Sequence, residues 1–299
     1  MAASEGRRCI LVKRIPIGFI GAGKVGVSLG KYFKEKGLQV GGYYSRTHKS
    51  ARWAAAFTQS TYYENLQEMI SSCEIILFTV PDGAIASLWE MVKPYISGKI
   101  IGHCSGLHSS KIFSDAGKAN CFAYSIHPLM AVNSRENSWR EFSNTLFTIE
   151  GDEKYLYYIE EILRGLGNKT RIISTENKIK YHAAAAILSN HLTALFDISQ
   201  TLFEECGFMG REELYYLAEG SLTNILKEGC MNALTGPVER NDVETVRKHV
   251  SVLEKETRIA YLANTAYLIR IAEKKHPDRD YSEMKNLCET LDQIERGIG

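Results

Sequence analysis

The 299-residue sequence predicts an α/β fold in which a doubly wound, mostly parallel sheet is followed by an all-helical C-terminal part. Two observations lead to this prediction. As far as about residue 174, short apolar runs alternate with helix-like stretches, which is the pattern of parallel strands covered by helices. After that point, apolar residues recur at helical spacing and almost no segment resembles a strand. We therefore expect two domains, 14–174 and 175–299.

Seven short apolar runs are predicted to be strands. One of them, 74–80, is nearly continuous, as expected of a strand that is buried on both faces. The seven runs are 15–21, 39–44, 74–80, 99–103, 121–126, 145–150 and 169–173. Helices are predicted over 24–36, 51–57, 155–166, 175–206, 212–226, 243–275 and 281–295. Asn241 and Glu244 are expected to form a capping box at the start of the helix 243–275.

The composition argues against several classes of protein. The 36 basic and 35 acidic residues leave a net charge of +1, so no strong field attracts nucleic acid or anionic lipid. No apolar run reaches the roughly 20 residues that span a bilayer, and the first eight residues lack the apolar core of a secretory signal. They are expected to be a frayed tail, with a short organellar leader as the alternative. The seven scattered cysteines indicate reduced thiols and a cytoplasmic protein. The histidine spacing predicts no metal site.

A glycine-rich turn is the first functional motif. The segment Gly21-Ala22-Gly23-Lys24-Val25-Gly26 fits G-x-G-x-x-G and lies between a predicted strand and a predicted helix. The first glycine permits a tight turn, the second lets a pyrophosphate approach the backbone, and the third lets the helix pack on the strand. The N-terminus of the helix then presents free N–H groups to the anion. These six residues are therefore predicted to bind a dinucleotide; a glycine turn without ligand is the alternative.

The end of the second predicted strand distinguishes between the two nicotinamide cofactors. An NAD site usually places an acidic residue there, on the ribose 2′-hydroxyl. Here the segment reads Ser45-Arg46-Thr47 with no acid. Arg46 can pair with a 2′-phosphate, while Ser45 and Thr47 can donate hydrogen bonds to it. The sequence therefore predicts NADP(H), with an exposed polar turn as the alternative.

Three loops follow strands at the edge of the sheet where ligands bind in such folds. Val80-Pro81-Asp82 and Ser105 are assigned to the cofactor. His127, fixed by Pro128 behind it, is the first candidate for the acid or base of a hydride transfer, because histidine titrates near neutral pH. His103 is a candidate for substrate binding. For both histidines, the alternative is a structural role in a buried loop.

Two more candidates lie in the helical part. Asn190 belongs to a polar stripe on the long predicted helix and could bind a substrate oxygen or the nicotinamide amide. Its alternative is an interhelical hydrogen bond. Arg240 lies in a loop before a helix and could clamp a substrate carboxylate. A surface ion pair is equally compatible with that position.

With these motifs in place, the chain resembles a family of predicted NADP-dependent oxidoreductases that pair a Rossmann-like domain with a helical domain of unknown function. This family lies within the 6-phosphogluconate dehydrogenase-like superfamily, together with prephenate dehydrogenase, ketopantoate reductase and pyrroline-5-carboxylate reductase. The resemblance extends from Ile15 to about Ala272. Besides the glycine turn it rests on Tyr44-Ser45-Arg46, Val80-Pro81-Asp82, His103-Cys104-Ser105-Gly106, His127-Pro128, Tyr181-His182-Ala183-Ala184, Ser189-Asn190 and Leu234-Thr235-Gly236-Pro237-Val238.

The resemblance implies site residues as well as a fold. Prephenate dehydrogenases are similar at the His-Pro element, which implies that His127 bonds the reacting hydroxyl. β-Hydroxyacid dehydrogenases carry a lysine four residues before an asparagine; Asn190 matches that asparagine, but Ala186 stands at the lysine position. This departure favours His127, with His182 as the second choice. The resemblance also implies a homodimer.

The sequence therefore predicts an enzyme that transfers hydride between NADP(H) and a small, anionic carbonyl or hydroxyl substrate. Three alternatives remain: reduction of an imine, a catalytically silent NADP(H)-binding sensor, and a scaffold whose glycine turn is vestigial.

Overall fold

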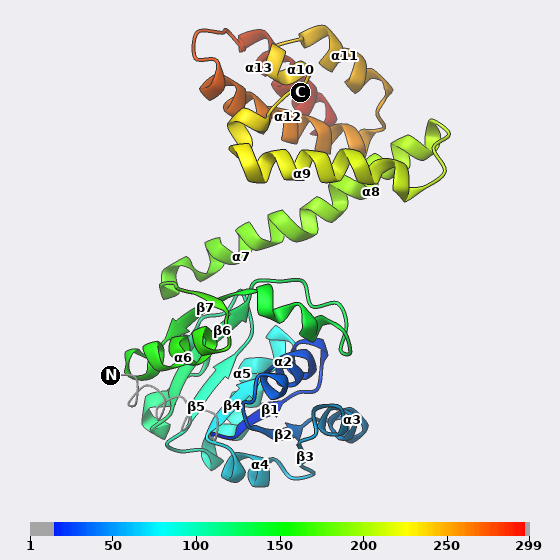
Figure 1. Ribbon diagram of the computed structural model, residues 1–299. Helices are drawn as coiled ribbons and strands as arrows, with labels where there is room; N and C mark the ends of the chain where they lie inside the picture. The colour runs from blue at the N-terminus through cyan, green and yellow to red at the C-terminus, as the bar shows by residue number, and fades with distance from the viewer. Residues whose placement is uncertain (1–14, 297–299) are drawn as a thin grey trace. The chain divides into compact units, whose positions relative to one another are not determined.

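The computed structural model describes residues 15–296 (Figure 1). The predicted tail, Cys9 and residue 14 lie outside the described residues. Contacts divide the chain into two compact units, one that ends at His191 and one that starts at Leu192. The sequence-based boundary at residue 174 lies before the last helix of the first unit. Each unit is described by itself.

The first unit is built on one sheet. Within the described residues it has eight strands in the order β3-β2-β1-β4-β5-β6-β7-β8. All neighbours pair in parallel except β6 and β7. The predicted mostly parallel sheet is thus confirmed, with the short β3 added. The strands are β1 (Ile17–Ile20), β2 (Val40–Tyr44), β3 (Thr61–Tyr62), β4 (Ile75–Phe78), β5 (Ile100–His103), β6 (Phe122–Pro128), β7 (Leu146–Gly151) and β8 (Lys169–Ile172).

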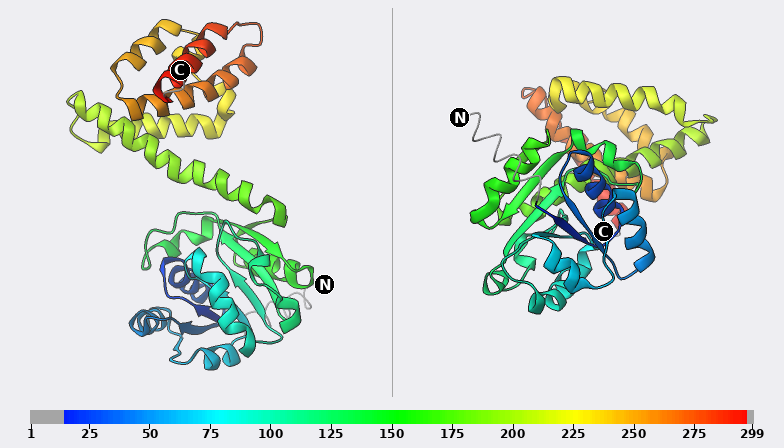
Figure 2. Two further views of the ribbon diagram at one scale, coloured as in Figure 1. Left: turned by 180° about the vertical axis from the view of Figure 1, so that it is seen from behind. Right: turned by 60° about the horizontal axis from the view of Figure 1, so that its bottom comes forward.

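Helices cover both faces of this sheet (Figures 1 and 2), which confirms the doubly wound arrangement. One buried core lies between the sheet and the helices α2, α3 and α6, and includes Leu29 and Ile159. A second core lies on the opposite face under α4 and α5, and includes Met69 and Trp89. The helices are α2 (Lys24–Glu35), α3 (His48–Thr58), α4 (Leu66–Ser72), α5 (Asp82–Val92), α6 (Glu153–Gly165) and α7 (Lys178–Ala186). Neither α4 nor α5 was predicted from the sequence.

The second unit is helical in the part that the structure describes. It has its own core, formed by residues such as Val246, Ile269 and Met284. Its helices are α8 (Leu192–Glu205), α9 (Arg211–Ala233), α10 (Pro237–Arg240), α11 (Val243–Val252), α12 (Lys255–Lys275) and α13 (Ser282–Arg296). None of the helices in the described range is long and apolar enough to cross a membrane.

Two helical predictions need correction. The predicted helix 243–275 is broken at Leu253, which has an extended backbone. The expected cap at Asn241 is wrong: Asp242 caps α11, and its side chain accepts a hydrogen bond from the Thr245 N–H at 3.0 Å. Asn241 instead adopts the left-handed conformation, φ 59°, that ends α10. Asparagine tolerates that conformation, so the acid one residue later becomes the cap.

One buried amide holds the loops around the sheet together. Asn168 is only 5% exposed. Its Nδ2 donates to the carbonyl oxygens of Phe142 (2.6 Å) and Thr145 (3.2 Å), and its Oδ1 accepts from the Tyr32 hydroxyl (2.7 Å). The loop between α6 and β8 is thereby fixed to α2 and to the segment before β7.

The change Asn168→Ala is expected to lower the free energy of unfolding by about 2 kcal/mol, because it leaves buried polar groups without partners. Urea denaturation measures this loss. Asn144→Ala, at an exposed position in the same region, is the matched control and should change little. Equal losses in both variants would contradict the role given to Asn168.

Candidate functional site

The glycine turn is held against the end of β4. Gly21 has φ +108°, and a Cβ there would lie 2.6 Å from the Thr79 carbonyl oxygen. A Cβ on Gly26 would collide with the Thr79 side chain. Gly23 is different: it is exposed, and the nearest atom to its Cβ position is 3.9 Å away. The turn is therefore tightly packed on its inner side, while Gly23 leaves open space in which a ligand can approach the backbone.

This turn forms one wall of a pocket of about 680 Å³ at the carboxyl ends of β1, β2 and β4. The predicted cofactor residues that line it are Gly21, Ala22, Gly23, Lys24, Ser45, Arg46, Thr47, Val80 and Pro81. Val25 and Gly26 lie behind the turn, in α2. The first turns of α2 and α3 carry no acidic residue, so nothing there repels an anion.

Other residues of this pocket were not found from the sequence. They are Ile20, Tyr44, Ser50, Thr79, Ala84, Ser87, Leu88, Met91 and Arg135. Several lie within a turn or two of the predicted motifs, so proximity in the chain could have indicated them. Arg135 lies far from those motifs in the sequence, and no local signal marks it.

Asp82 and Ser105 connect the pocket to the neighbouring strands. Asp82 follows the pocket residue Pro81 and starts α5. The Ser105 hydroxyl donates to Asp82 Oδ2 at 2.7 Å and accepts from the backbone N–H groups of Leu107 and His108. Ser105 is thus buried and positions Asp82, and neither of these two predicted cofactor residues lines the pocket.

His127 lies beyond the end of β5. In the β5–β6 pairing, His103 is opposite Ser125, so His127 extends two residues farther at the carboxyl edge. Its Nδ1 is 2.7 Å from the Tyr181 hydroxyl on α7. Burial, assisted by the charges of Lys178 and His182, lowers the pKa of His127 to about 3. The imidazole is therefore neutral at neutral pH.

A buried lysine lies next to this pair. Lys178 is 1% exposed. Its Nζ donates to Ser125 Oγ at 2.7 Å and to the Ser105 carbonyl oxygen at 3.1 Å. Burial lowers the pKa of Lys178 to about 8, against the opposing influence of Glu150 and Asp82. Neither Lys178 nor Tyr181 was assigned to the site from the sequence. A lysine at the start of a helix usually faces solvent, and Tyr181 was noted only as part of a family motif.

His182 lies beside His127, with ring centroids 6.3 Å apart and perpendicular planes. Its Nδ1 is buried and has no hydrogen-bond partner among residues 15–296. A Cβ at Gly106 would lie 2.5 Å from His182 Nδ1 and 2.9 Å from His127 Nε2. A glycine at this position is therefore required for the two imidazoles to adopt this arrangement.

His103 is enclosed by the fold. It is fully buried, its Nδ1 accepts from the Ser105 N–H, and its Nε2 bonds the Ser109 carbonyl oxygen, each at 3.2 Å. Burial lowers the pKa of His103 to about 4. With both ring nitrogens engaged, this geometry favours a structural role over substrate binding. Burial also raises the pKa of the adjacent Cys104 thiol to about 12, which makes it a poor nucleophile.

The last two predicted residues, Asn190 and Arg240, are both exposed. Asn190 is exposed in the π-helical segment Ile187–His191, where its Oδ1 accepts from the Ser189 hydroxyl at 3.0 Å. Arg240 belongs to the second unit, where it ends α10 and is exposed.

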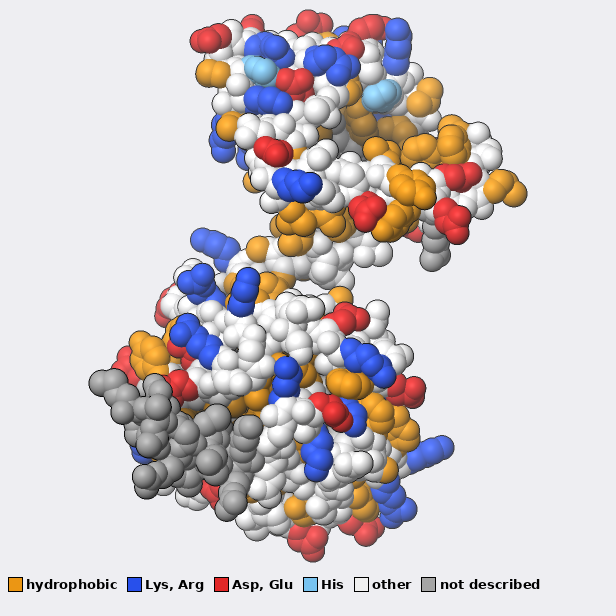
Figure 3. Space-filling view, in the orientation of Figure 1, with side chains coloured by type: hydrophobic (Ala, Val, Ile, Leu, Met, Phe, Trp, Pro, Cys, Tyr) orange, Lys and Arg blue, Asp and Glu red, His pale blue; other side chains and the backbone are white. Residues whose placement is uncertain are grey.

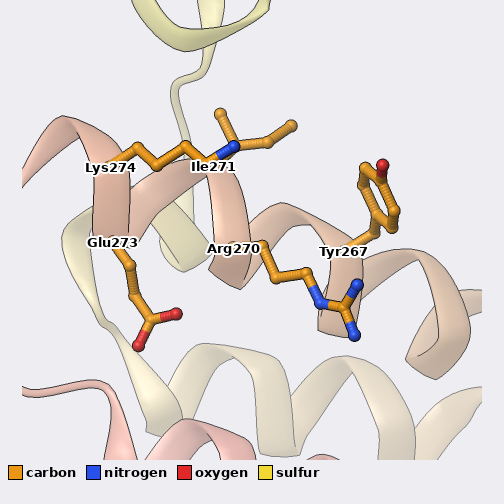
Figure 4. Close-up of a pocket in the computed structure, with 5 residues that line it drawn as sticks. All are labelled: Tyr267, Arg270, Ile271, Glu273 and Lys274. Carbon is orange, nitrogen blue, oxygen red and sulfur yellow. The ribbon is translucent and has the colours of Figure 1, made fainter.

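A different pocket, of about 450 Å³, lies in the second unit. All five of its lining residues come from α12, and Figure 4 shows their side chains spread along that helix: Tyr267, Arg270, Ile271, Glu273 and Lys274. Such a pocket lacks the convergent polar groups of a binding site. Throughout 15–296, no cluster of three His, Cys, Asp or Glu residues is arranged to hold a metal ion.

The two buried, neutral histidines predict acid sensitivity. The unfolded chain takes up a proton on each near pH 6.5, whereas the folded protein does so only near pH 4 at His103 and pH 3 at His127. The free energy of unfolding therefore falls as the pH decreases from about 6.5 to 4.

His103→Gln should reduce the slope of unfolding free energy against pH by at most about 1.4 kcal/mol per pH unit, as measured by urea denaturation at several pH values. His191→Gln, at an exposed position, should keep the slope; an unchanged slope in His103→Gln would refute the explanation.

Comparisons with known proteins agree with this architecture. Residues 1–128 match the Rossmann-like domain family, and residues 145–268 match a domain of unknown function, DUF2520. No curated protein matches the sequence.

Solved structures share the fold over most of the chain. Protein TM1727 from Thermotoga maritima is 28% identical, with a TM-score of 0.69 over 87% of this chain and 99% of that one. A "putative NADP oxidoreductase" from Bacteroides fragilis is 20% identical, with a TM-score of 0.72 and the same coverage. A reductive aminase from Aspergillus terreus, in complex with NADPH and ethyl-5-oxohexanoate, is 15% identical, with a TM-score of 0.59 over 95% of each chain. Two family models thus match this chain one after the other, first the Rossmann-like domain and then the domain of unknown function DUF2520.

Proposed function

We propose that this protein is an NADP(H)-dependent oxidoreductase that transfers hydride to or from a small substrate with a C=O or C=N bond. The observation that carries the proposal is the pocket of about 680 Å³, in which the glycine turn and Ser45-Arg46-Thr47 face the same space. Asp82 follows the pocket residue Pro81 and accepts a hydrogen bond from Ser105, whose carbonyl oxygen accepts one from Lys178, the cation that acts on His127.

The pocket residues have complementary tasks in this proposal. The backbone around Gly23 and the N-terminus of α2 would hold the pyrophosphate. Arg46, assisted by Ser45 and Thr47, would bind the 2′-phosphate through charge-assisted hydrogen bonds. The nicotinamide, when bound, supplies or accepts the hydride at its ring carbon C4.

His127 would act on the substrate as a neutral hydrogen-bond donor, and the proton that completes the reduction would come from water. In the tautomer in which the Tyr181 hydroxyl donates to Nδ1, the Nε2 atom carries the proton and would donate to the substrate oxygen or nitrogen. The lowered pKa of His127 makes a neutral donor a better assignment than the full acid or base suggested by the sequence. A neutral imidazole is an effective electrophile toward a carbonyl.

The substrate is assigned only as a class. The His127 geometry supports carbonyl reduction, and the fold shared with a reductive aminase supports an imine. An anionic group on the substrate rests on the exposed Arg240 and stays a prediction, as does a cytoplasmic location.

The homodimer also stays a prediction. Large hydrophobic side chains are exposed on α8 and α9, where Figure 3 shows them gathered on the surface. They include Leu192, Phe196, Leu222, Leu226 and Met231. A second copy of the chain is one partner that could cover them.

The cofactor assignment predicts that the protein binds NADPH at least tenfold more tightly than NADH, about 1.4 kcal/mol. Arg46→Ala should remove most of this preference, because the guanidinium is expected to bind only the phosphorylated cofactor. Titration of nicotinamide fluorescence measures both affinities. Arg52→Ala is the matched control, because Arg52 lies in α3, close to Arg46 in the sequence. Its guanidinium stacks on Tyr62, 4.9 Å from the ring centroid, and Arg52 does not line the pocket.

The outcomes separate the alternatives. Equal affinity for the two cofactors would refute the assignment of the 2′-phosphate site. Binding of neither cofactor would refute the oxidoreductase and favour the scaffold. Tight NADPH binding with a change in oligomer size, but without hydride transfer to any carbonyl or imine in a broad panel, would favour the sensor.

The role of His127 is tested by turnover of NADPH with a substrate from that panel. His127→Asn should lower kcat about 100-fold, the size expected for loss of one hydrogen-bond donor to the developing negative charge, while the NADPH Kd stays unchanged. Tyr181→Phe should have a smaller effect, about tenfold, since it removes only the group that orients the ring. Full activity in His127→Asn would show that another residue acts on the substrate.

A further inference from the structure

Arg135 brings a second arginine to the cofactor pocket. It lies between β6 and β7, and its loop is fixed to α2: the Ser28 hydroxyl donates to the Ser134 carbonyl oxygen at 2.8 Å and approaches that of Arg135 at 3.4 Å. The Arg135 side chain lines the pocket together with Arg46. Its backbone is thus held in place, and its side chain faces the predicted cofactor.

The guanidinium of Arg135 has unmet hydrogen-bonding capacity. It stacks on Trp53 of α3, 4.5 Å from the ring centroid. Within the described part of the chain, its Nε and Nη2 are buried and have no hydrogen-bond partner. These two atoms form one edge of the guanidinium, which suits two oxygens of a phosphate. Because buried donors without partners are costly, an anion in the pocket would stabilise this side chain.

The position on α3 indicates which phosphate this is. Trp53 lies three residues after Ser50, so the two share one face of α3, and Ser50 lines the pocket. That helix directly follows the turn Ser45-Arg46-Thr47, where the 2′-phosphate is predicted to bind, whereas the pyrophosphate is expected at the glycine turn. We infer that Arg135 and Arg46 form a two-arginine clamp on the 2′-phosphate of NADP(H). The inference rests on the proposed function and adds a residue outside the β2–α3 turn.

The test compares binding of two probes, 2′,5′-ADP and 5′-AMP, by isothermal titration calorimetry of the full chain. Arg135→Met should weaken binding of 2′,5′-ADP about tenfold and change that of 5′-AMP less than twofold. Arg135→Lys should recover only part of the affinity, because lysine keeps the charge but lacks the two-donor edge. NADPH and NADH titrations should show the same selective loss.

Arg140→Met is the matched control. Arg140 lies in the same loop and also stacks on a tryptophan, Trp139, at 4.7 Å, but its Nη1 already donates to Asn137 Oδ1 and it does not line the pocket. The Arg140→Met variant should therefore leave the affinities for 2′,5′-ADP and 5′-AMP unchanged. Unfolding curves that match the wild type would show that Arg135→Met still folds.

Two results would overturn the inference. If Arg135→Met weakened the binding of both probes equally, Arg135 would contact a group that they share, such as the 5′-phosphate. If it changed neither affinity, Arg135 would not belong to the cofactor site. Failure of the proposed function looks different, since the wild-type chain itself would then show no preference for 2′,5′-ADP.

Discussion

The buried ammonium group of Lys178 is the constraint on which the site depends. A charge with so little solvent must be neutralised or fully hydrogen-bonded, and its partners come from separate elements: Ser125 on β6 and the Ser105 carbonyl oxygen in the loop after β5. Ser105 in turn holds Asp82 at the start of α5. One cation therefore aligns the ends of three elements, and its field helps to keep His127 uncharged.

The parts that could be read from the sequence are those fixed by local chemistry. The glycine turn needs a positive φ at Gly21 and no side chain at Gly26, and both requirements are visible in six consecutive residues. The polar residues that follow β2 are also adjacent in the sequence, so they could be recognised in the same way. Strands that are buried on both faces have apolar sequences, so most of the sheet could be predicted. The exception is β3, whose two residues are too few to form a recognisable apolar run.

The remainder depends on contacts between residues far apart in the chain. Arg135 reaches the pocket because its loop is fixed to α2, and Tyr181 meets His127 only because α7 packs near the end of β6. Nothing in the local sequence distinguishes Lys178 from a solvent-facing lysine. The break at Leu253 has no glycine or proline to mark it, and at Asn241-Asp242 two capping residues compete for one helix end.

The pairing of His127 with Tyr181 also bears on how such a chain can be rearranged. His127 falls within the segment that matches the Rossmann-like domain, and Tyr181 within the segment that matches DUF2520. The pair is thus divided between two sequence modules, although both residues lie in one compact unit. A chimera that joined either module to an unrelated partner would keep the glycine turn or the helices. It would, however, contain only one of the two residues, His127 or Tyr181, that form this contact. Recombination between relatives is therefore restricted to combinations that preserve both sides.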